Sequence, residues 1–150
     1  MGHKLVLFVE DNRAEAKLMR LALDQNGVTA QVKAARDGEE ALDILLSADR
    51  NGNPRPSVVF LDLKLPKVSG LEVLKVVRSQ DGLRMLPVVI LSSSGREKDI
   101  RSAYRLGANS YVRKPVNFDE FTKAVDQLTS YWLGLNQPGL CEGVTSGTRK

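Results

Sequence analysis

Acidic side chains that directly follow short apolar runs are the residues of this sequence best suited to chemistry. Glu10 and Asp11 follow the run Leu5–Val9. Asp62 follows the run Val58–Leu61 in the same way. A strand that ends in a carboxylate places it at the sheet edge where open α/β proteins bind their ligands. Two carboxylates ~4 Å apart repel by about 4 kcal/mol at an effective dielectric of ~20, so this arrangement predicts a neutralising cation.

A lysine in a similar context would supply further positive charge. Lys114 follows Tyr111 and Val112, which belong to a later apolar run. A hard divalent cation with oxygen ligands would neutralise the carboxylates. The ammonium group of Lys114 would then be a second positive pole. Together these residues predict a site that holds a metal ion and a transferable phosphoryl group.

Five capping boxes, each a Ser, Asp or Asn followed three residues later by Glu, predict the starts of helices. They are Asn12…Glu15, Asp37…Glu40, Ser69…Glu72, Ser94…Glu97 and Asn117…Glu120. Each follows a short apolar segment that we interpret as a strand: Leu5–Val9, Ala30–Ala35, Val58–Leu61, Val88–Leu91 and Tyr111–Val116. Alternating strands and helices predict an α/β fold, a doubly wound five-stranded parallel sheet with helices on both faces.

Helical spacing predicts which side of each helix faces the core. In the first helix we expect one apolar line to be buried, consisting of Ala14, Leu18 and Leu21. The opposite line is expected to be exposed and consists of Ala16, Met19 and Leu23. The core stripes of the second and last helices are Ala41, Leu42 and Leu45, and Phe118, Phe121, Val125, Leu128 and Trp132. Residues 51–56 are predicted to form a loop because they contain two prolines and a glycine.

Composition and charge limit the classes of function. The chain has 22 Lys and Arg against 18 Asp and Glu, a net charge of +4, but its basic residues are scattered and predict no nucleic-acid partner. The single cysteine, Cys141, excludes an internal disulfide. No apolar stretch is long enough to span a membrane, so a cytoplasmic protein is expected. We expect one domain over residues 4–133 and a flexible tail over residues 134–150, which is rich in glycine and polar residues.

The sequence resembles the receiver domains of response regulators over residues 4–133. Five motif positions match in order: Glu10, Asp11, Asp62, Ser92 and Lys114, with Pro115 directly after the lysine. The resemblance implies a flavodoxin-like fold with strand order 2-1-3-4-5. A narrower resemblance connects the chain to the stand-alone regulators of bacterial phytochrome histidine kinases. It rests on Glu10-Asp11-Asn12, the Pro54 and Pro56 loop and the Tyr131-Trp132 ending.

The resemblance implies a role for each residue of the site. Asp62 would be the phosphoacceptor, attacking a phosphohistidine of the partner kinase. Asp11, Asp62 and the backbone carbonyl of Lys64 would bind Mg²⁺ directly, and Glu10 would bind it partly through water. Ser92 and Lys114 would contact the phosphoryl oxygens.

The resemblance also implies changes in conformation and assembly. Ser92 would move on phosphorylation and Tyr111 would follow as the second switch residue. The bond before Pro115 is expected to be cis. The exposed line on the first helix is a candidate surface for the kinase. An apolar line that continues to Trp132 predicts a homodimer through the last helix, although this end could instead fold back on its own domain.

Other functions use similar residues. A phosphatase of the haloacid dehalogenase type needs a second Asp two positions after the nucleophile, where this chain has Lys64. A flavodoxin binds a phosphate after its first strand, where Glu10 and Asp11 would repel it. A phosphorylation-independent scaffold stays open, but the acidic and lysine residues are all present. A regulator without an output domain could signal by contacts, or act as a phosphate sink or relay.

Overall fold

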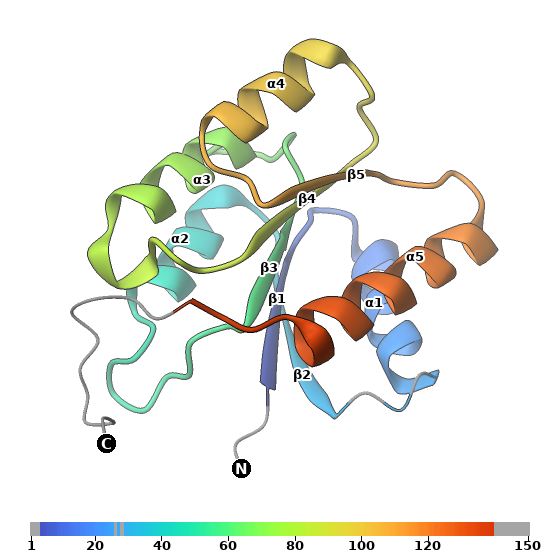
Figure 1. Cartoon of the computed structure of the whole chain (residues 1–150), viewed down its shortest axis with the longest axis horizontal. Coiled ribbons are helices and arrows are strands. Elements are labelled where there is room, and N and C mark those ends of the chain that lie inside the picture. Colours follow the sequence, from blue (N-terminus) through green and yellow to red (C-terminus); the bar gives the residue numbers. More distant parts are fainter. Residues whose placement is uncertain (1–3, 26, 28, 140–150) are drawn as a thin grey trace.

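The computed structural model describes residues 4–25, 27 and 29–139, which form a three-layer α/β sandwich (Figure 1). The sheet contains five parallel strands in the order β2-β1-β3-β4-β5, which confirms the predicted fold class and strand order. Their bounds are β1 Lys4–Val9, β2 Ala30–Ala35, β3 Val58–Leu61, β4 Val88–Ser92 and β5 Ser110–Arg113. The three central strands β1, β3 and β4 are buried over almost their whole length, as strands covered on both faces must be.

Helices cover both faces of the sheet (Figure 1). They are α1 Arg13–Gln25, α2 Gly38–Leu46, α3 Gly70–Ser79, α4 Glu97–Arg105 and α5 Phe118–Ser130, with short turns at Asp81–Leu83 and Tyr131–Leu135. One core lies between the sheet and α2, α3 and α4. A second core lies between the sheet and α1 and α5. The alternation of strand residues between these two cores is the period of two that a pleated strand imposes.

The predicted boundaries hold at most elements. Asp37, Ser69 and Asn117 cap α2, α3 and α5 with their side chains, as the capping boxes indicated. Asn12 does the same for α1, since its Oδ1 accepts from the amide of Glu15 at 3.2 Å. Strand β5 is shorter than the apolar run predicted, because the chain leaves the sheet after Arg113.

The predicted start of α4 was wrong. The helix begins at Glu97, and Ser94 lies outside it. Ser94 Oγ accepts from the amide of Arg96 at 3.2 Å and donates to Asp99 Oδ2 at 2.5 Å. The hydroxyl of Ser94 is therefore used to shape the loop before the helix, and it pairs with an acid two residues beyond Glu97.

The predicted core face of α1 was also wrong. Met19 and Leu23, expected to be exposed, are 0% and 1% exposed, whereas Leu21, expected in the core, is 53% exposed. Ala16, from the same expected surface, is half-buried and packs against the core. Both lines of this helix are apolar, and the packing of α1 against α5 and the sheet selects the Met19 line. The proposed kinase-docking line is therefore not a surface.

A glycine allows α3 to begin directly beside the candidate site. A Cβ atom at Gly70 would lie 2.1 Å from the backbone oxygen of Asp62, too close for any other residue without a backbone shift. The Gly70 amide donates to the carbonyl of Leu63 at 2.9 Å. The first turn of α3 therefore fixes the segment that carries Asp62.

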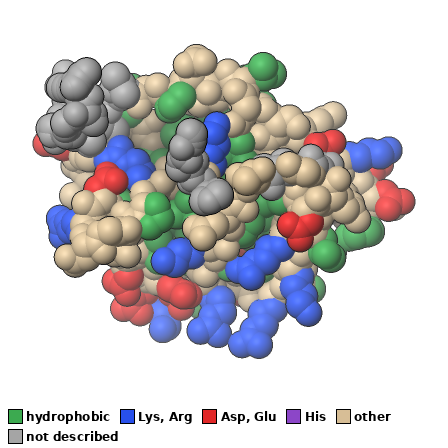
Figure 2. Space-filling model, turned by 90° about the horizontal axis from the view of Figure 1, so that it is seen from below, with side chains coloured by type: hydrophobic (Ala, Val, Ile, Leu, Met, Phe, Trp, Pro, Cys, Tyr) green, Lys and Arg blue, Asp and Glu red, His purple; other side chains and the backbone are tan. Residues whose placement is uncertain are grey.

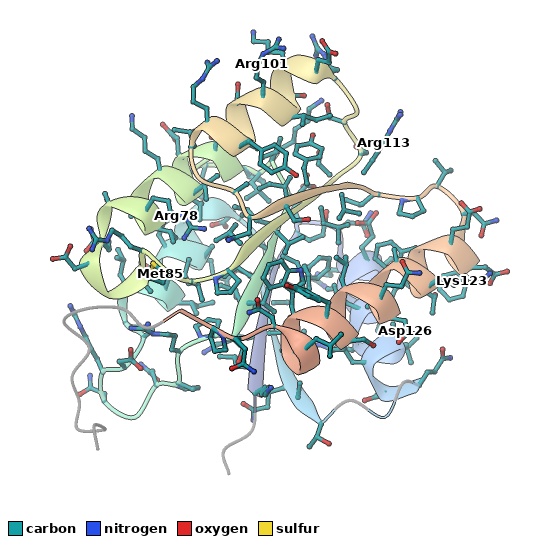
Figure 3. The ribbon with its side chains drawn as sticks, in the orientation of Figure 1. Arg78, Met85, Arg101, Arg113, Lys123 and Asp126 are labelled. Carbon is teal, nitrogen blue, oxygen red and sulfur yellow. The ribbon has the colours of Figure 1, made fainter. Side chains whose placement is uncertain are left out.

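The opposite end of the sheet is closed by side chains and by the end of the described chain. Arg78 donates from α3 to the carbonyls of Leu86 and Gly107 at 2.8 and 2.9 Å, which fastens the α4–β5 connection to this end (Figure 3). Lys4 donates to the carbonyl of Leu133. Figure 2 views this end, with hydrophobic side chains visible in the middle of the face. Residues 140–150, the larger part of the expected tail, lie outside the described residues.

A membrane-spanning helix is not found within residues 4–25, 27 and 29–139, as none of their helices is both long and apolar enough.

Candidate functional site

Three carboxylates meet at the ends of β1 and β3. These strands are neighbours, with Val9 opposite Leu61, so the residues that follow them emerge side by side. Glu10, Asp11 and Asp62 each offer an oxygen, and these atoms lie within 4.8 Å of one another. Glu10 and Asp62 are buried and Asp11 is exposed. The structure thus brings together the acidic residues that the sequence predicted would meet.

Lys114, from the segment after β5, reaches into the same cleft. Its Nζ lies 2.6 Å from Glu10 Oε1 and 3.4 Å from Asp62 Oδ2. The Lys114 amide donates to the carbonyl of Ser92 at 2.7 Å, which fixes the backbone beside the end of β4. The side chain of Lys114 is only 9% exposed, so its charge acts where water screens it poorly.

The charges of Glu10 and Lys114 depend on each other. Burial raises the pKa of Glu10 to about 8, and the hydrogen bond from Lys114 partly offsets this effect. Burial opposes the charge of Lys114, but its hydrogen bonds to Glu10 and Glu15 outweigh burial and raise its pKa above the usual value. Lys114 is therefore cationic at every physiological pH.

The donor set of this cleft suits a hard cation. Glu10, Asp11 and Asp62 supply only oxygen ligands, which Ca²⁺, Mg²⁺ and Mn²⁺ prefer. Among the ion pairs found in the described part of the chain, none involves Asp11. Asp62 forms one such pair, with Lys114 at 3.4 Å. The cleft therefore holds more carboxylate than its one lysine can neutralise.

Ser92, whose carbonyl accepts from the Lys114 amide, is linked to Tyr111 through the loop after β4. Ser92 is buried at the end of β4, and its Oγ accepts from the amide of Ser94 at 3.2 Å. The hydroxyl of Tyr111 donates to the carbonyl of Ser94 at 2.8 Å. The amide of Tyr111 donates to the hydroxyl of Tyr104 in α4 at 3.1 Å. A movement of the loop after Ser92 would consequently displace the Tyr111 hydroxyl and alter the contact between Tyr111 and Tyr104 in α4.

Two expectations at the edges of the site have different outcomes. The Lys64 amide donates to Asp62 Oδ1 at 3.4 Å, which places Lys64 next to the cleft, while metal binding by its carbonyl stays a prediction. The expected cis bond before Pro115 was wrong, because no described peptide bond is cis. The trans form is favoured at X–Pro bonds by about 0.5–1 kcal/mol unless a turn demands otherwise.

Glu15 belongs to the cleft and the sequence reasoning assigned it only to a helix cap. Its Oε1 lies 2.7 Å from Lys114 Nζ. A capping-box glutamate would bond the amide of its own cap, but the Asn12 amide donates instead to Glu10 Oε2 at 3.1 Å. The position of Glu15 in the sequence could have indicated this, since it lies in the first turn of the helix that directly follows Glu10 and Asp11.

The model of the response regulator receiver domain family matches residues 6–126 of the chain. The chain belongs to this family. Its strand order and the acidic cluster and lysine at the strand ends agree with that membership.

Curated relatives match this receiver chain over most of their own length. It is 42% identical to the probable methanogenesis regulatory protein FilR2 of Methanothrix harundinacea over 90% of the chain and 88% of the relative. It is 34% identical to response regulator Rcp1 of Synechocystis over 87% of the chain and 89% of the relative.

Solved structures give the same family. The phosphorylated cyanobacterial phytochrome response regulator RcpA has a TM-score of 0.85 at 36% identity, covering 91% of this chain and 99% of RcpA. The bacteriophytochrome response regulator AtBRR has a TM-score of 0.69 at 45% identity, covering 91% of this chain and 100% of AtBRR. A Mn²⁺-bound form of Rcp1 has a TM-score of 0.83 at 33% identity, covering 91% and 99%.

Membership of this family indicates the general chemistry of the protein. It is a response regulator of two-component signalling, a class in which phosphorylation by a partner kinase is typical. Receiver domains are phosphoacceptors rather than enzymes in the ordinary sense, and they bind a divalent metal. The corresponding end of the sheet in this chain carries the acidic cluster Glu10, Asp11 and Asp62.

Proposed function

We propose that this receiver accepts a phosphoryl group on Asp62 from a histidine kinase in a Mg²⁺-dependent reaction. The observation that carries the proposal is the convergence of three carboxylates and Lys114, with Lys114 Nζ 3.4 Å from Asp62 Oδ2. Asp62 is a buried member of this cluster and also contacts the lysine. These surroundings are what an in-line phosphoryl transfer needs, because positioning and charge stabilisation provide most of its catalysis.

The chain's own residues would carry the reaction as follows. An oxygen of Asp62 attacks the phosphorus of the kinase phosphohistidine, the P–N bond breaks and an acyl phosphate forms. Lys114 stabilises the negative charge on the phosphoryl oxygens. Water later hydrolyses the acyl phosphate in a reaction assisted by the same cleft, and Lys64 and Ser94 flank the route of the attacking water.

The oxygen ligands that this cleft offers are the type that Mg²⁺ prefers. Glu10, Asp11, Asp62 and the carbonyl of Lys64 would hold Mg²⁺, with Glu10 acting partly through water. When bound, the ion supplies positive charge beside the transferring phosphoryl group. Mg²⁺ is proposed over larger cations because a shallow, partly exposed cleft lets it keep several waters.

The signal would leave the site through Ser92 and Tyr111. Phosphorylation would draw the Ser92 hydroxyl toward the phosphoryl oxygens, away from the Ser94 amide that it accepts from at 3.2 Å. The Tyr111 hydroxyl is bonded to the carbonyl of Ser94, so it would move with this loop. The result would be a changed surface over α4 and β5. This response would act through protein contacts or by relaying the phosphoryl group, rather than through nucleic acid.

The partner kinase that we propose is a bacterial phytochrome. RcpA and AtBRR, to which this receiver is similar, are described as phytochrome and bacteriophytochrome response regulators.

We also propose a receiver domain over residues 4–133, a flexible tail over residues 134–150, a cytoplasmic location and a homodimer through the last helix. Support for the dimer comes from exposed apolar side chains there: Phe118, Tyr131 and Leu135. Trp132 is half-buried and lines a cavity of its own domain, so it is not the anchor of such a dimer.

The experiment is phosphorylation of the whole chain by acetyl phosphate and Mg²⁺, followed by mass spectrometry of the intact protein. One acid-stable, base-labile phosphoryl group is expected. Asp62→Asn should abolish it, because an amide is neutral and a poor nucleophile. The matched control is Asp81→Asn, an exposed acid in the turn after α3, which should be phosphorylated like the wild type. Undiminished phosphorylation of Asp62→Asn would refute the assignment.

A further inference from the structure

Glu15 is the charged residue of the cleft that the phosphoryl-transfer scheme leaves without a role. Its Oε1 lies 2.7 Å from Lys114 Nζ, whereas the Asp62 oxygen is 3.4 Å from the same nitrogen. With Glu10 at 2.6 Å, the two carboxylates near the start of α1 hold the ammonium group more closely than Asp62 does. The ammonium group of Lys114 therefore lies on the α1 side of the cleft.

This position is not explained by the helix cap. In α2 the equivalent glutamate, Glu40, reaches back and accepts from the amide of Arg36 at 2.9 Å. At α1 the amide of the cap residue Asn12, which is the donor that a capping box offers to its glutamate, bonds Glu10 instead. Glu15 is consequently released from capping and its carboxylate faces the cleft.

An ammonium group has three protons to donate, and here side-chain oxygens of Glu10, Glu15 and Asp62 lie within hydrogen-bond distance of it. A phosphoryl group on Asp62 would bring nearly two negative charges and three strong acceptor oxygens. At least one donor of Lys114 must then move to it. Glu15 is the partner that costs least to release, because its side chain is 29% exposed and water can replace the lysine, whereas the side chain of Glu10 is 3% exposed.

We propose that Glu15 is a positioning residue that holds Lys114 on the α1 side of the cleft and competes with the phosphoryl group for it. This inference deepens the proposed function and rests on it. A contact that exists only in the unphosphorylated state stabilises that state alone, so it lowers the affinity of the cleft for a phosphoryl group. Repulsion between the Glu15 carboxylate and the phosphoryl oxygens acts in the same direction.

The test is the affinity of the whole chain for beryllofluoride, a phosphoryl mimic, measured by ¹⁹F NMR or calorimetry in saturating Mg²⁺. Glu15→Gln should bind it about three- to tenfold more tightly, because the competing bond changes from a charged to a neutral one, which is roughly half as strong. Glu15→Asp keeps the charge but shortens the reach, and should give a smaller gain. Glu72→Gln is the matched control, since Glu72 occupies the same capping-box position in α3, and its affinity should equal that of the wild type.

The outcomes are separable. A gain of affinity cannot come from loss of a merely structural contact, which would weaken or abolish binding. Unchanged or weaker binding by both Glu15 variants, with normal binding by the wild type, overturns the role of Glu15 and leaves the phosphoacceptor function intact. A wild-type chain that neither binds beryllofluoride nor is phosphorylated on Asp62 overturns the proposed function and this inference together.

Discussion

Glu10 Oε1 lies 2.6 Å from Lys114 Nζ while the Glu10 side chain is only 3% exposed. This hydrogen bond joins the end of β1 to the segment after β5 across the candidate site. Because burial raises the pKa of Glu10 to about 8, this pair makes the protonation of the metal site depend on pH near neutrality.

The first prediction is that Mg²⁺ affinity rises with pH between about 5 and about 8 and that binding releases protons below about pH 8. A cation requires the Glu10 carboxylate, whereas the metal-free folded protein retains its proton up to about pH 8. Calorimetric titration in buffers of different ionisation enthalpy measures both effects. Glu10→Gln is the control, and its weaker binding should be nearly independent of pH in this range. A wild-type affinity that is flat over the range would contradict the prediction.

The raised pKa of Glu10 also makes the stability of the metal-free protein depend on pH. The folded pKa of Glu10 lies above its unfolded value of 4.5, so the folded state binds the proton more tightly. This contribution to the free energy of unfolding is fully present below about pH 4.5 and is lost as pH rises through about 8. Thermal denaturation in a chelator should show wild type losing stability relative to Glu10→Gln across this window. Parallel curves for the two proteins would refute the shift.

A third prediction concerns the crowding of acids. Replacing Asp11 by Asn removes one of three clustered carboxylates, so the metal-free protein should melt roughly 2–4 °C higher, as expected for a gain of about 1 kcal/mol in a chain of this size. The same change should weaken Mg²⁺ binding. Asp43→Asn, an exposed acid in the middle of α2, is the control and should alter neither quantity. Unchanged Mg²⁺ affinity in Asp11→Asn would remove Asp11 from the ligand set.

A fourth prediction follows from the corrected face of α1. Met19→Ala should lower the free energy of unfolding by about 2–5 kcal/mol, because it opens a cavity in the core under the sheet. Leu21→Ala, on the exposed side of the same helix, should change it by less than about 0.5 kcal/mol. Urea denaturation of both variants decides between the two faces. Equal losses would mean that the packing of α1 is not the one described.

The residues that could be predicted from sequence are those whose position along the chain alone determines where they lie. Asp62 follows a buried strand, so the parallel sheet necessarily delivers it to the same edge as Glu10. The face of α1 could not be predicted in this way, since both of its apolar lines satisfy the helical period. Packing of α1 against α5 determines which of the two lines is buried.

Side-chain competition explains the other errors. Ser94 fits a capping box with Glu97, yet its hydroxyl donates to Asp99, and the helix starts at Glu97 itself. Glu15 also fits a capping box, but the amide of Asn12 bonds Glu10, and the Glu15 carboxylate pairs with Lys114 instead. A local sequence motif indicates hydrogen-bond partners within one helical turn. It cannot indicate a partner such as Lys114, which lies 99 residues after Glu15 in the sequence.

The last prediction concerns self-association. Leu135 is 76% exposed at the end of the chain segment after α5, and Tyr131 nearby is also exposed. Large apolar side chains gathered at one end of a helix favour burial against a second copy, and a twofold dimer brings the same patch together with itself. We therefore expect Leu135→Glu to dissociate a wild-type dimer, because it would place two like charges in the contact. Leu46→Glu is the matched control on α2, where a leucine is also exposed but lies on the opposite face of the sheet. Sedimentation velocity over a range of concentrations measures the effect, and a wild type that stays monomeric throughout, or equal dissociation by both variants, would exclude the dimer through the last helix.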